Sequence, residues 1–527
     1  MKRISPGWIL LAILILGAVF RLTFLQSIPP YQVDEGSWNI GARDKILEGD
    51  WCYHIRKFCV SPVHEVLFYL WFLIWSSSLL AARILSVIID IASIVLIYVV
   101  GRKLFTTRTG LIASYLFAVN SVIILYARKA MLESDLIFWL LLSFLLFANR
   151  KLWSRALAGI VLALAIGTKL YAFKMLLVFG VYEVMMFWDD RGWRPFQALV
   201  RRPFLVFLAA TAFGTALIFG TVFHYYPVEF TTERASYAAP FSLIPKLFGA
   251  ESLSVSIKYY ALRDGPIILL ALLAFLFLVF RWRHDRSDFS KRLNRNAVFL
   301  IHWTWIIFLT VAWMTYQPPR YHCMEMPAYI LLAALFIDRE LFQIPQLVFA
   351  GAKRWKRVLG WLVLVFLLAF TLGSQMWFYF LNGHRNTSAP EALAWVNNYI
   401  PSTASIGADY YMAVSLPHNE IFPLHPQRYY TVSPGKMLLI DDYFVDPFGL
   451  PEYYSNPIPG HFREHANNFP DYVLLPVNHG DTGGRARYAR FMRSPNFVDN
   501  YSVMKEFVDD DGYRTILYVR KSLSGSN

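Results

Sequence analysis

Long apolar blocks, separated by short polar and basic segments, run through most of the chain. The clear blocks contain few charged residues, and most approach the ~20 residues that a helix needs to cross a bilayer. Eleven such blocks occupy residues 7–28, 82–100, 109–126, 134–148, 156–170, 171–187, 203–224, 265–280, 297–316, 321–337 and 358–381. This pattern predicts a mainly α-helical membrane protein with about eleven, and at most thirteen, transmembrane helices.

The first block predicts a retained span and not a cleaved signal peptide. It is longer than an ordinary signal core, contains Arg21 and is not followed by a small-residue cleavage site.

The stretch 63–75 has an apolar core of about a dozen residues, which is short for a span. Its placement decides where the basic segments lie, and basic segments favour the cytoplasm. If 63–75 lies on the membrane surface and the N-terminus is cytoplasmic, all the main basic segments become cytoplasmic: 102–108, 150–155, 191–202, 281–295 and 353–357. We therefore predict an interfacial helix within a long first external loop, residues 29–80.

The same parity places the remaining polar loops on the extracytoplasmic side. These are residues 127–133, 225–264, 317–320 and everything after 381. Most of the candidate chemistry described below falls on that side of the predicted membrane.

The last part of the chain changes character after residue 381. Pro, Asn and Asp become frequent, and no further spanning block follows. A helix beginning near Ser388 and short strands within 404–411, 436–444, 471–477 and 514–521 predict a small soluble α/β domain. The chain is thus divided into a transmembrane domain, 1–381, and an extracytoplasmic domain, 382–527.

Composition narrows the class further. The 527 residues are 56% hydrophobic and carry a formal charge of +14. Because the basic residues lie in short loops between apolar blocks, they indicate topology and imply no nucleic-acid partner. Cys52 and Cys59 share one loop and could pair in an oxidising compartment, whereas Cys323 begins an apolar block and is expected as a buried thiol.

Two adjacent carboxylates, Asp34 and Glu35, follow the first block and precede a helical-looking run. One interpretation is an ordinary helix start, where acids complement the helix dipole. The other is catalytic, because a carboxylate at the membrane boundary can deprotonate a hydroxyl acceptor or hold a divalent ion.

A second polar cluster contains Arg128, Lys129, Glu133 and Asp135 between two blocks. One interpretation is that these residues are ordinary charged flanks of membrane helices, whose long side chains reach toward the interface. The other is that they bind an anionic partner.

Lys169 and the pair Arg320 and Tyr321 form two further polar positions at block boundaries. Cations just inside the lipid are costly without a partner. Several on one face predict an anionic ligand such as a lipid phosphate, which Arg can bind through two oxygens and Lys as a point charge.

His64 and His224 lie in an outer loop and at a span end. No metal-ligand spacing supports them, so satisfied or exposed histidines are favoured over a metal site, although Glu35 and His224 remain candidate ligands for a divalent metal. Arg21 and Asp90 lie within predicted spans, where an ion pair or a polar bundle contact is expected. The sequence requires no cofactor.

Familiar nucleotide-binding and nucleophile motifs are absent from convincing positions, so a cytosolic nucleotide donor is not expected.

Several segments, in order, resemble C-type (GT-C) glycosyltransferases of the protein O-mannosyltransferase superfamily, which includes the bacterial lipid A aminoarabinose transferases. They are Asp34-Glu35, "AARILSVIIDIASIVLIYVVGRKLF", "GLIASYLFAVNSVIILYARKAMLES", "LAGIVLALAIGTKLYAF" and "PRYHCMEMPAYILLAALF". The resemblance covers most of the membrane part and implies a GT-C-type helical bundle.

The resemblance also implies roles for individual residues. Asp34 matches the family's catalytic base, with Glu35 beside it in acceptor or metal binding. Arg128 and Glu133 are similar to an arginine-to-acid spacing in the family, and Lys169 and Arg320 match basic positions assigned to the donor phosphate.

The first loop departs from the family pattern. Many members have His-Pro-Pro there, whereas this chain has Ser61-Pro62-Val63-His64-Glu65. A supporting or acceptor-binding role for His64 is therefore in question.

The implied activity is inverting transfer of a sugar from a polyprenyl-phosphate donor to a hydroxyl on a protein, lipid or glycan. The expected location is a bacterial or archaeal plasma membrane. Two rivals stay open: a transporter or flippase for a lipid-linked sugar, and a ligase or polymerase with a pyrophosphate-linked donor.

Overall fold

The structure is a computed structural model of the chain. It describes residues 5–26, 33–52, 56–187, 195–231, 264–279, 292–312, 319–342, 352–380, 388–409, 412, 414–417, 420–424, 429–433, 436–440, 470–476, 495–508 and 514–524.

The chain forms two compact units, each assembled from segments far apart in sequence. The first unit contains Met1–Thr23, Cys59–His64 and Ile84–Met376, and the second contains Phe24–Phe58, Glu65–Arg83 and Trp377–Asn527. The predicted division at residue 381 stays a prediction.

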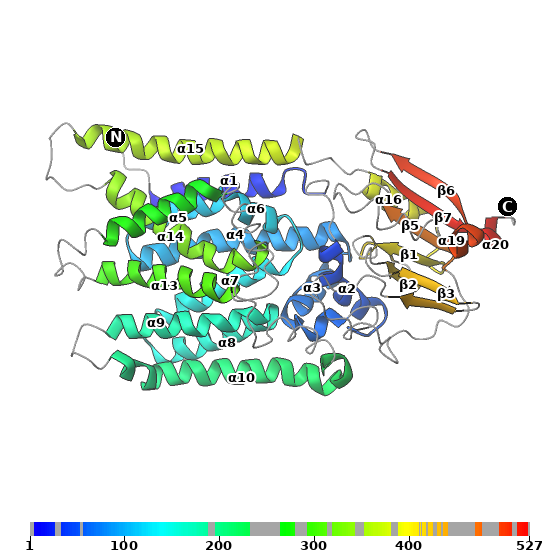
Figure 1. The fold of residues 1–527 in the computed structure, drawn as a ribbon, viewed down its shortest axis with the longest axis horizontal. Helices are drawn as coiled ribbons and strands as arrows, with labels where there is room; N and C mark the ends of the chain where they lie inside the picture. The colour runs from blue at the N-terminus through cyan, green and yellow to red at the C-terminus, as the bar shows by residue number, and fades with distance from the viewer. Residues whose placement is uncertain are drawn as a thin grey trace. The chain divides into compact units, whose positions relative to one another are not determined.

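The chain is mainly helical, as predicted (Figure 1). The helices that account for most of the first unit are α1 (Pro6–Leu22), α4 (Leu79–Leu104), α5 (Thr107–Ala118), α6 (Ser121–Ala127), α7 (Leu132–Phe147), α8 (Leu152–Thr168), α9 (Met175–Phe187), α10 (Arg202–Tyr225), Asp264–Val279, α13 (Arg292–Ala312), α14 (Met326–Phe336) and α15 (Ala352–Phe380). Short 3-10 segments, Leu170–Lys174, Pro195–Val200 and Pro319–Glu325, and a π-helical segment, Ile337–Phe342, lie between them.

Among the described residues, α4 and α10 are long and apolar enough to cross a membrane, and α5 with α6 qualifies as a third span if the bent pair is counted as one. The block 109–126 was expected to be one continuous helix. Instead, a bend of 61° separates α5 from α6. Asn120 stands at the break and caps α6, because its side-chain oxygen accepts a hydrogen bond from the Ile123 amide at 2.8 Å. The count of eleven spans stays a prediction.

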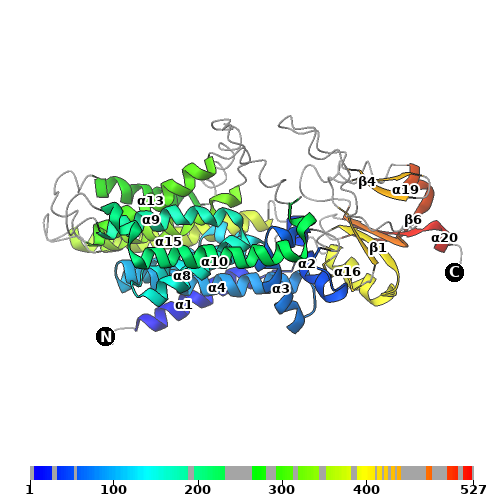
Figure 2. The same cartoon turned by 90° about the horizontal axis from the view of Figure 1, so that it is seen from below.

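Small residues bring α8 and α10 into close contact, and the two helices run side by side (Figure 2). A Cβ atom at Gly159 would come within 2.5 Å of the Phe207 carbonyl oxygen, and one at Gly214 within 2.8 Å of the Ala163 side chain. Any larger residue would push the helices apart. Such contacts between small residues are how helices pack in lipid, where apolar burial alone gives no preference.

Two pairs of opposite charge are buried inside the first unit. Arg21 and Asp90, each expected to form an ion pair or a polar contact, pair with each other: Arg21 Nε lies 2.5 Å from Asp90 Oδ2, and both side chains are buried. Arg155 and Glu183 form a second buried pair at 2.7 Å. A buried charge without a partner would cost several kcal/mol.

The second unit combines helices from the first loop with an α/β part. It contains α2 (Val33–Leu47), most of α3 (Pro62–Ile74) and α16 (Ser388–Tyr399). At 13 residues, α3 is shorter than a span, in keeping with its predicted interfacial position.

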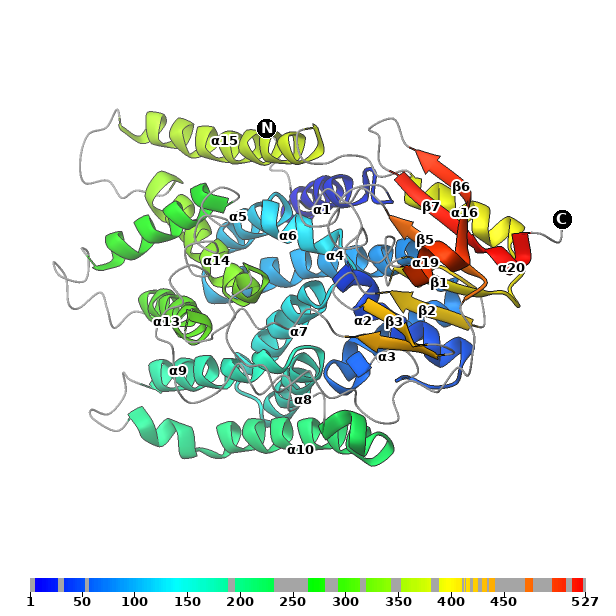
Figure 3. The same cartoon turned by 45° about the vertical axis from the view of Figure 1, so that its right-hand side comes forward.

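A mixed five-stranded sheet has the order β2-β1-β5-β7-β6 (Figure 3). Its strands are β1 (Ser405–Asp409), β2 (Glu420–Leu424), β5 (Tyr472–Pro476), β6 (Tyr501–Val508) and β7 (Arg514–Arg520). Strand β1 is parallel to β2 and β5, whereas β7 is antiparallel to β5 and β6.

A separate antiparallel pair is formed by β3 (Tyr429–Ser433) and β4 (Lys436–Ile440), and two short helices, α19 (Pro495–Asn500) and α20 (Lys521–Ser524), complete the unit. All four predicted strand regions contain a strand, and β2, β3 and β6 were missed.

Candidate active site

Helix α2 carries the two acids predicted from the first loop. Asp34 lies in its first turn, and the side chain of Asp34 lies outside the part that the structure describes. The neighbouring Glu35 is fully buried, and its Oε2 accepts a hydrogen bond from Arg83 Nη2 at 2.8 Å. Arg83 also donates to the Leu25 carbonyl at 2.9 Å. Glu35 is therefore one partner of a buried ion pair.

The middle of α2 packs closely on Glu65 of α3. Glu65 Oε2 accepts a hydrogen bond from the Ala42 amide at 2.8 Å, and a Cβ atom at Gly41 would approach the Glu65 carboxyl group to 3.1 Å. Burial raises the pKa of Glu65 well above its ordinary value. A neutral carboxylic acid fits this site better than a carboxylate.

Arg43 lies further along the same helix and is also fully buried. Its Nε and Nη2 donate to the carbonyl oxygen of Leu416 at 3.1 and 2.9 Å, and Nη1 donates to Asp44 Oδ1 at 3.1 Å. Burial lowers the pKa of Arg43, and the charge of Asp44 opposes that shift.

In the first unit, Lys169 and Glu133 form a buried ion pair. Lys169 caps the C-terminus of α8, and its Nζ lies 2.7 Å from Glu133 Oε1 in the first turn of α7. The ammonium group also lies 4.7 Å from the centre of the Tyr321 ring. Three predicted residues are thus brought together in one buried group.

Two tyrosines and a second lysine extend this group. The Tyr171 and Tyr321 rings have centroids 4.7 Å apart, and Lys174 Nζ lies 5.4 Å from the Tyr171 ring. Lys174 donates to the Thr310 carbonyl at 2.9 Å. The first unit therefore holds two ammonium groups against a tyrosine pair.

His64 belongs to the first unit through a short loop. Ser61 Oγ donates to the Thr168 carbonyl at 2.5 Å, which fixes the loop at the end of α8. His64 Nδ1 lies 2.7 Å from Asp135 Oδ2, and both side chains are fully buried. Asp135 in turn lies within electrostatic reach of Glu133. The histidine therefore has a carboxylate partner, and Asp135 is more than a charged helix flank.

Arg128 caps the C-terminal end of α1. Its guanidinium donates to the carbonyl oxygens of Phe20 at 2.7 Å, Arg21 at 3.3 Å and Thr23 at 2.6 Å. These contacts satisfy carbonyl groups that the end of a helix leaves without partners.

The remaining predicted residues are more open. Arg320 is half-buried in the 3-10 segment Pro319–Glu325. His224 is exposed in the last turn of α10, with its ring against Tyr225.

No group of three His, Cys, Asp or Glu residues suited to a metal ion occurs in the part of the chain that the structure describes. In the described part of the chain, no disulfide joins Cys52 and Cys59, and Cys323 is buried as expected.

The predicted residues thus fall into two sets. Asp34 and Glu35 belong to the second unit, whereas Arg128, Lys169 and Arg320 belong to the first.

Sequence reasoning missed several members of these sets. They are Arg43, Glu65, Arg83, Lys174, His322 and Glu325. His322 Nδ1 lies 2.5 Å from Glu325 Oε1. Lys174 and Glu325 each stand inside an apolar block, and that position could have identified them.

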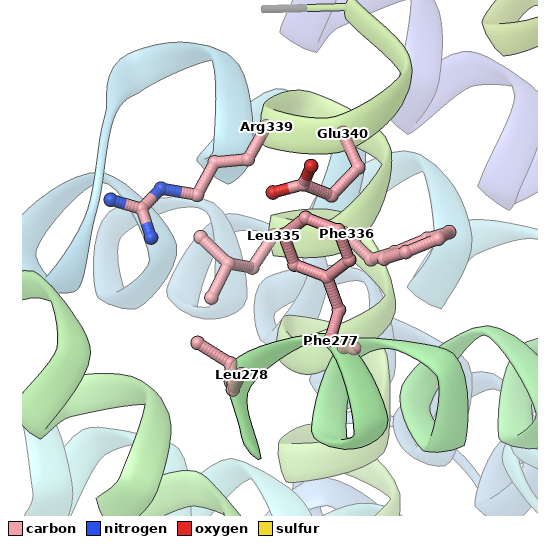
Figure 4. A pocket seen from close by; sticks show the side chains of 7 residues that line it. Phe277, Leu278, Leu335, Phe336, Arg339 and Glu340 are labelled. Carbon is pink, nitrogen blue, oxygen red and sulfur yellow. The ribbon is translucent and has the colours of Figure 1, made fainter. Parts of the chain in front are cut away.

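A pocket between the helix Asp264–Val279 and the end of α14 lies apart from these residues (Figure 4). Apolar side chains form most of its wall, and Arg339 and Glu340 of the π-helical segment complete it. None of the predicted site residues lines it.

Comparison with known proteins bears on the fold of the chain. Residues 60–219 match the family model described as dolichyl-phosphate-mannose-protein mannosyltransferase. Comparison with the curated proteins gave no match.

The chain is similar to the crystal structure of ArnT from Cupriavidus metallidurans bound to undecaprenyl phosphate, with 15% identity, a TM-score of 0.60 and coverage of 98% of each chain. The resemblance to the GT-C glycosyltransferases is confirmed.

A second structure shares this GT-C fold. The oligosaccharyltransferase AglB from Archaeoglobus fulgidus, in complex with an inhibitory peptide and a dolichol-phosphate, has 12% identity and a TM-score of 0.53. The match covers 97% of this chain and 74% of AglB. At these identities the likeness concerns the fold, and it extends over both units of the chain.

Proposed function

We propose that this GT-C protein is an integral-membrane glycosyltransferase that moves a sugar from a polyprenyl-phosphate donor to a hydroxyl acceptor, with inversion, on the extracytoplasmic face. The observation that carries the proposal is the buried group of Lys169, Glu133 and Tyr321 in a GT-C fold. Similar structures were solved with undecaprenyl phosphate and with dolichol-phosphate.

Lys169 is the proposed centre of donor-phosphate binding. Its ammonium group is buried and held by a single carboxylate oxygen of Glu133 in the described contacts, with the Tyr321 ring on another side. The phosphodiester of the donor carries one negative charge on two acceptor oxygens, and a second charge develops as its bond to the sugar breaks, so the phosphate is a suitable ligand for this cation. Arg320, which is half-buried in the segment that also carries Tyr321, is proposed as a second phosphate contact, and Arg128 as a third.

Asp34 is the proposed base. It removes the proton of the acceptor hydroxyl, the hydroxyl oxygen attacks the anomeric carbon, and the bond between that carbon and the phosphate oxygen breaks. The electron pair leaves with the lipid phosphate, where nearby cations stabilise the developing charge. Asp34 then returns its proton to water.

His64 and Glu133 are proposed to support this reaction by holding neighbouring groups. Glu133 orients Lys169, and the pairing of His64 with Asp135 fixes the loop that follows residue 60. His224 stays a possible acceptor contact, because it is exposed.

The residues do not favour the divalent-ion site suggested by the sequence. Glu35 already accepts a hydrogen bond from Arg83, so the proposal assigns it no divalent ion. No step of the proposed reaction requires a divalent metal.

The test is a donor panel. Purified protein is incubated with polyprenyl-phosphate sugars that differ in the sugar, together with protein, lipid and glycan acceptors, and the released lipid phosphate is measured. We expect one donor to be consumed, with a matching glycosylated acceptor whose anomeric configuration is inverted.

Each rival gives a different outcome in the same assay. Release of lipid pyrophosphate from a pyrophosphate-linked donor would replace this proposal with the ligase or polymerase reading. Movement of an intact lipid-linked sugar across vesicles, without cleavage of the sugar–phosphate bond, would replace it with a flippase.

A further inference from the structure

Two buried arginines hold helix α2 at two points along its length. Arg83 reaches the first turn through Glu35, and Arg43 joins the later part of the helix to Leu416. Asp34 precedes Glu35 directly, so the first of these contacts is one residue from the proposed base.

The contact at the first turn involves three buried side chains. Arg83 lies in the first turns of α4 and uses Nη2 for Glu35 Oε2 and Nη1 for the Leu25 carbonyl. The Glu35 carbonyl accepts a hydrogen bond from Asn39 Nδ2 at 2.6 Å. The Glu35, Asn39 and Arg83 side chains are all fully buried, which fixes the rotation of α2 about its axis.

The second contact joins α2 to a segment 373 residues away in sequence. Arg43 directs two donors at the carbonyl oxygen of Leu416, so the guanidinium plane is set by one acceptor. Lysine could offer only a flexible point charge at this place.

The segment that receives Arg43 is itself fixed. Val414 and Leu416 are buried, and Ser415 accepts hydrogen bonds from the Leu79 amide through Oγ at 3.1 Å and from Asn397 Nδ2 through its carbonyl at 3.2 Å. Helix α16, which carries Asn397, packs against β6 and β7 of the sheet. Arg43 therefore connects α2 to the sheet-bearing part of the second unit.

Joining helices through buried charges has a high desolvation cost. An apolar pair of similar volume is often as stabilising or more so, because two ions must lose their water. The use of two buried arginines to hold one short helix is explained if the direction of the helix matters more than its stability.

We propose that Arg43 and Arg83 are positioning residues that aim the first turn of α2, and that the segment 414–416 serves this purpose by supplying the Leu416 carbonyl. This inference rests on the proposed function of Asp34 as base. It gives Glu35 the role of partner to Arg83 in place of acceptor or metal binding, and it gives the C-terminal part of the chain a role in catalysis.

The test compares Arg43→Met and the milder Arg43→Lys with Arg155→Met. Arg155 is a matched control, because it is equally buried and paired with Glu183 but belongs to the first unit. We expect Arg43→Met to lower kcat by about 100-fold, since small misplacements of a catalytic group cost this much. The KM for the lipid-phosphate donor should change less than about twofold.

Arg43→Lys should fall between wild type and Arg43→Met in kcat at unchanged melting temperature, which keeps the test valid if Arg43→Met folds poorly. A loss of kcat in Arg155→Met equal to that in Arg43→Met, at equal loss of melting temperature, would overturn the proposal, because the effect would then be one of stability.

Hydrogen exchange of the α2 amides gives a readout that needs no activity. We expect faster exchange over Val33–Leu47 in both Arg43 variants and unchanged exchange there in Arg155→Met. Unchanged exchange in Arg43→Met would overturn the positioning role of Arg43 even in an active enzyme. If the wild-type protein consumes no donor but its Arg43 variants show faster exchange, the proposed function of the chain is contradicted. The bond from Arg43 to Leu416 is then only a structural contact.

Discussion

A lysine of the first unit and an arginine of the second unit are held by different kinds of acceptor. Lys169 Nζ meets a carboxylate oxygen of Glu133 at 2.7 Å. Arg43 directs two of its donors at the backbone carbonyl oxygen of Leu416, a residue far away in sequence.

This difference separates binding from positioning. A carboxylate side chain can rotate away from a lysine when a phosphate arrives, so the pair of Lys169 and Glu133 is suited to ligand exchange. A backbone carbonyl cannot move without its chain. Arginines that bind such carbonyls are suited to holding a helix still.

The largest expected effect on activity comes from replacing Lys169, the side chain proposed to bind the donor phosphate. Lys169→Met should lower kcat/KM by about 100- to 1,000-fold, because it removes a positive charge from the developing lipid phosphate. Initial rates with the donor found in the panel measure this.

Lys103→Met is the matched control for Lys169, since Lys103 donates to the Leu145 carbonyl in the same unit. Equal rates for the two variants would show that Lys169 has no special part in donor binding.

A smaller effect, on stability, is expected at the pair of Glu35 and Arg83. Glu35→Gln or Arg83→Met alone should lower the free energy of unfolding by about 3–5 kcal/mol, because each leaves a buried charge without its partner. The double variant should recover part of this loss. A double-mutant cycle by chemical unfolding in detergent measures the coupling, and strictly additive losses would mean that the two side chains do not act as a pair.

The smallest effect is a pH dependence from Glu65. Burial raises the pKa of Glu65 above its ordinary value of 4.5, so folding favours the protonated form. The stability that Glu65 contributes is complete below pH 4.5 and is lost as the pH rises toward the raised pKa of the folded protein.

Glu65→Gln should remove this dependence, because a neutral amide oxygen can still accept the Ala42 N–H. Melting temperatures at about pH 5 and about pH 8 measure the difference. A wild-type protein whose melting temperature rises over this interval relative to Glu65→Gln would contradict the raised pKa.

The sequence predicted features that depend on a local residue pattern or on the need of a buried charge for a polar partner. Arg21 and Asp90 were expected to find polar partners because lipid offers none, and they pair with each other. The apolar run at 472–475 was recognised as a strand, and it forms part of β5.

Other features depend on contacts that no local pattern encodes. The break at Asn120 lies in an apolar block, and a single asparagine side chain there was not enough to predict a bend of 61°. The bond from Arg43 to Leu416 uses a backbone carbonyl, which every residue has, so the side chain at 416 gives no indication of it. The partner of Glu35 was missed because Arg83 lies at the start of an apolar block, where no local pattern connects it with Glu35.

Replacement of the proposed base tests the central claim most directly. Asp34→Asn is compared with Asp50→Asn, which alters a half-buried carboxylate in the turn after α2. The measurement is single-turnover release of lipid phosphate from the donor in the presence of acceptor. We predict that Asp34→Asn binds the donor normally but loses transfer by at least about 100-fold, within the range of general-base catalysis, while Asp50→Asn transfers at nearly the wild-type rate. Transfer by Asp34→Asn at the wild-type rate would contradict the account.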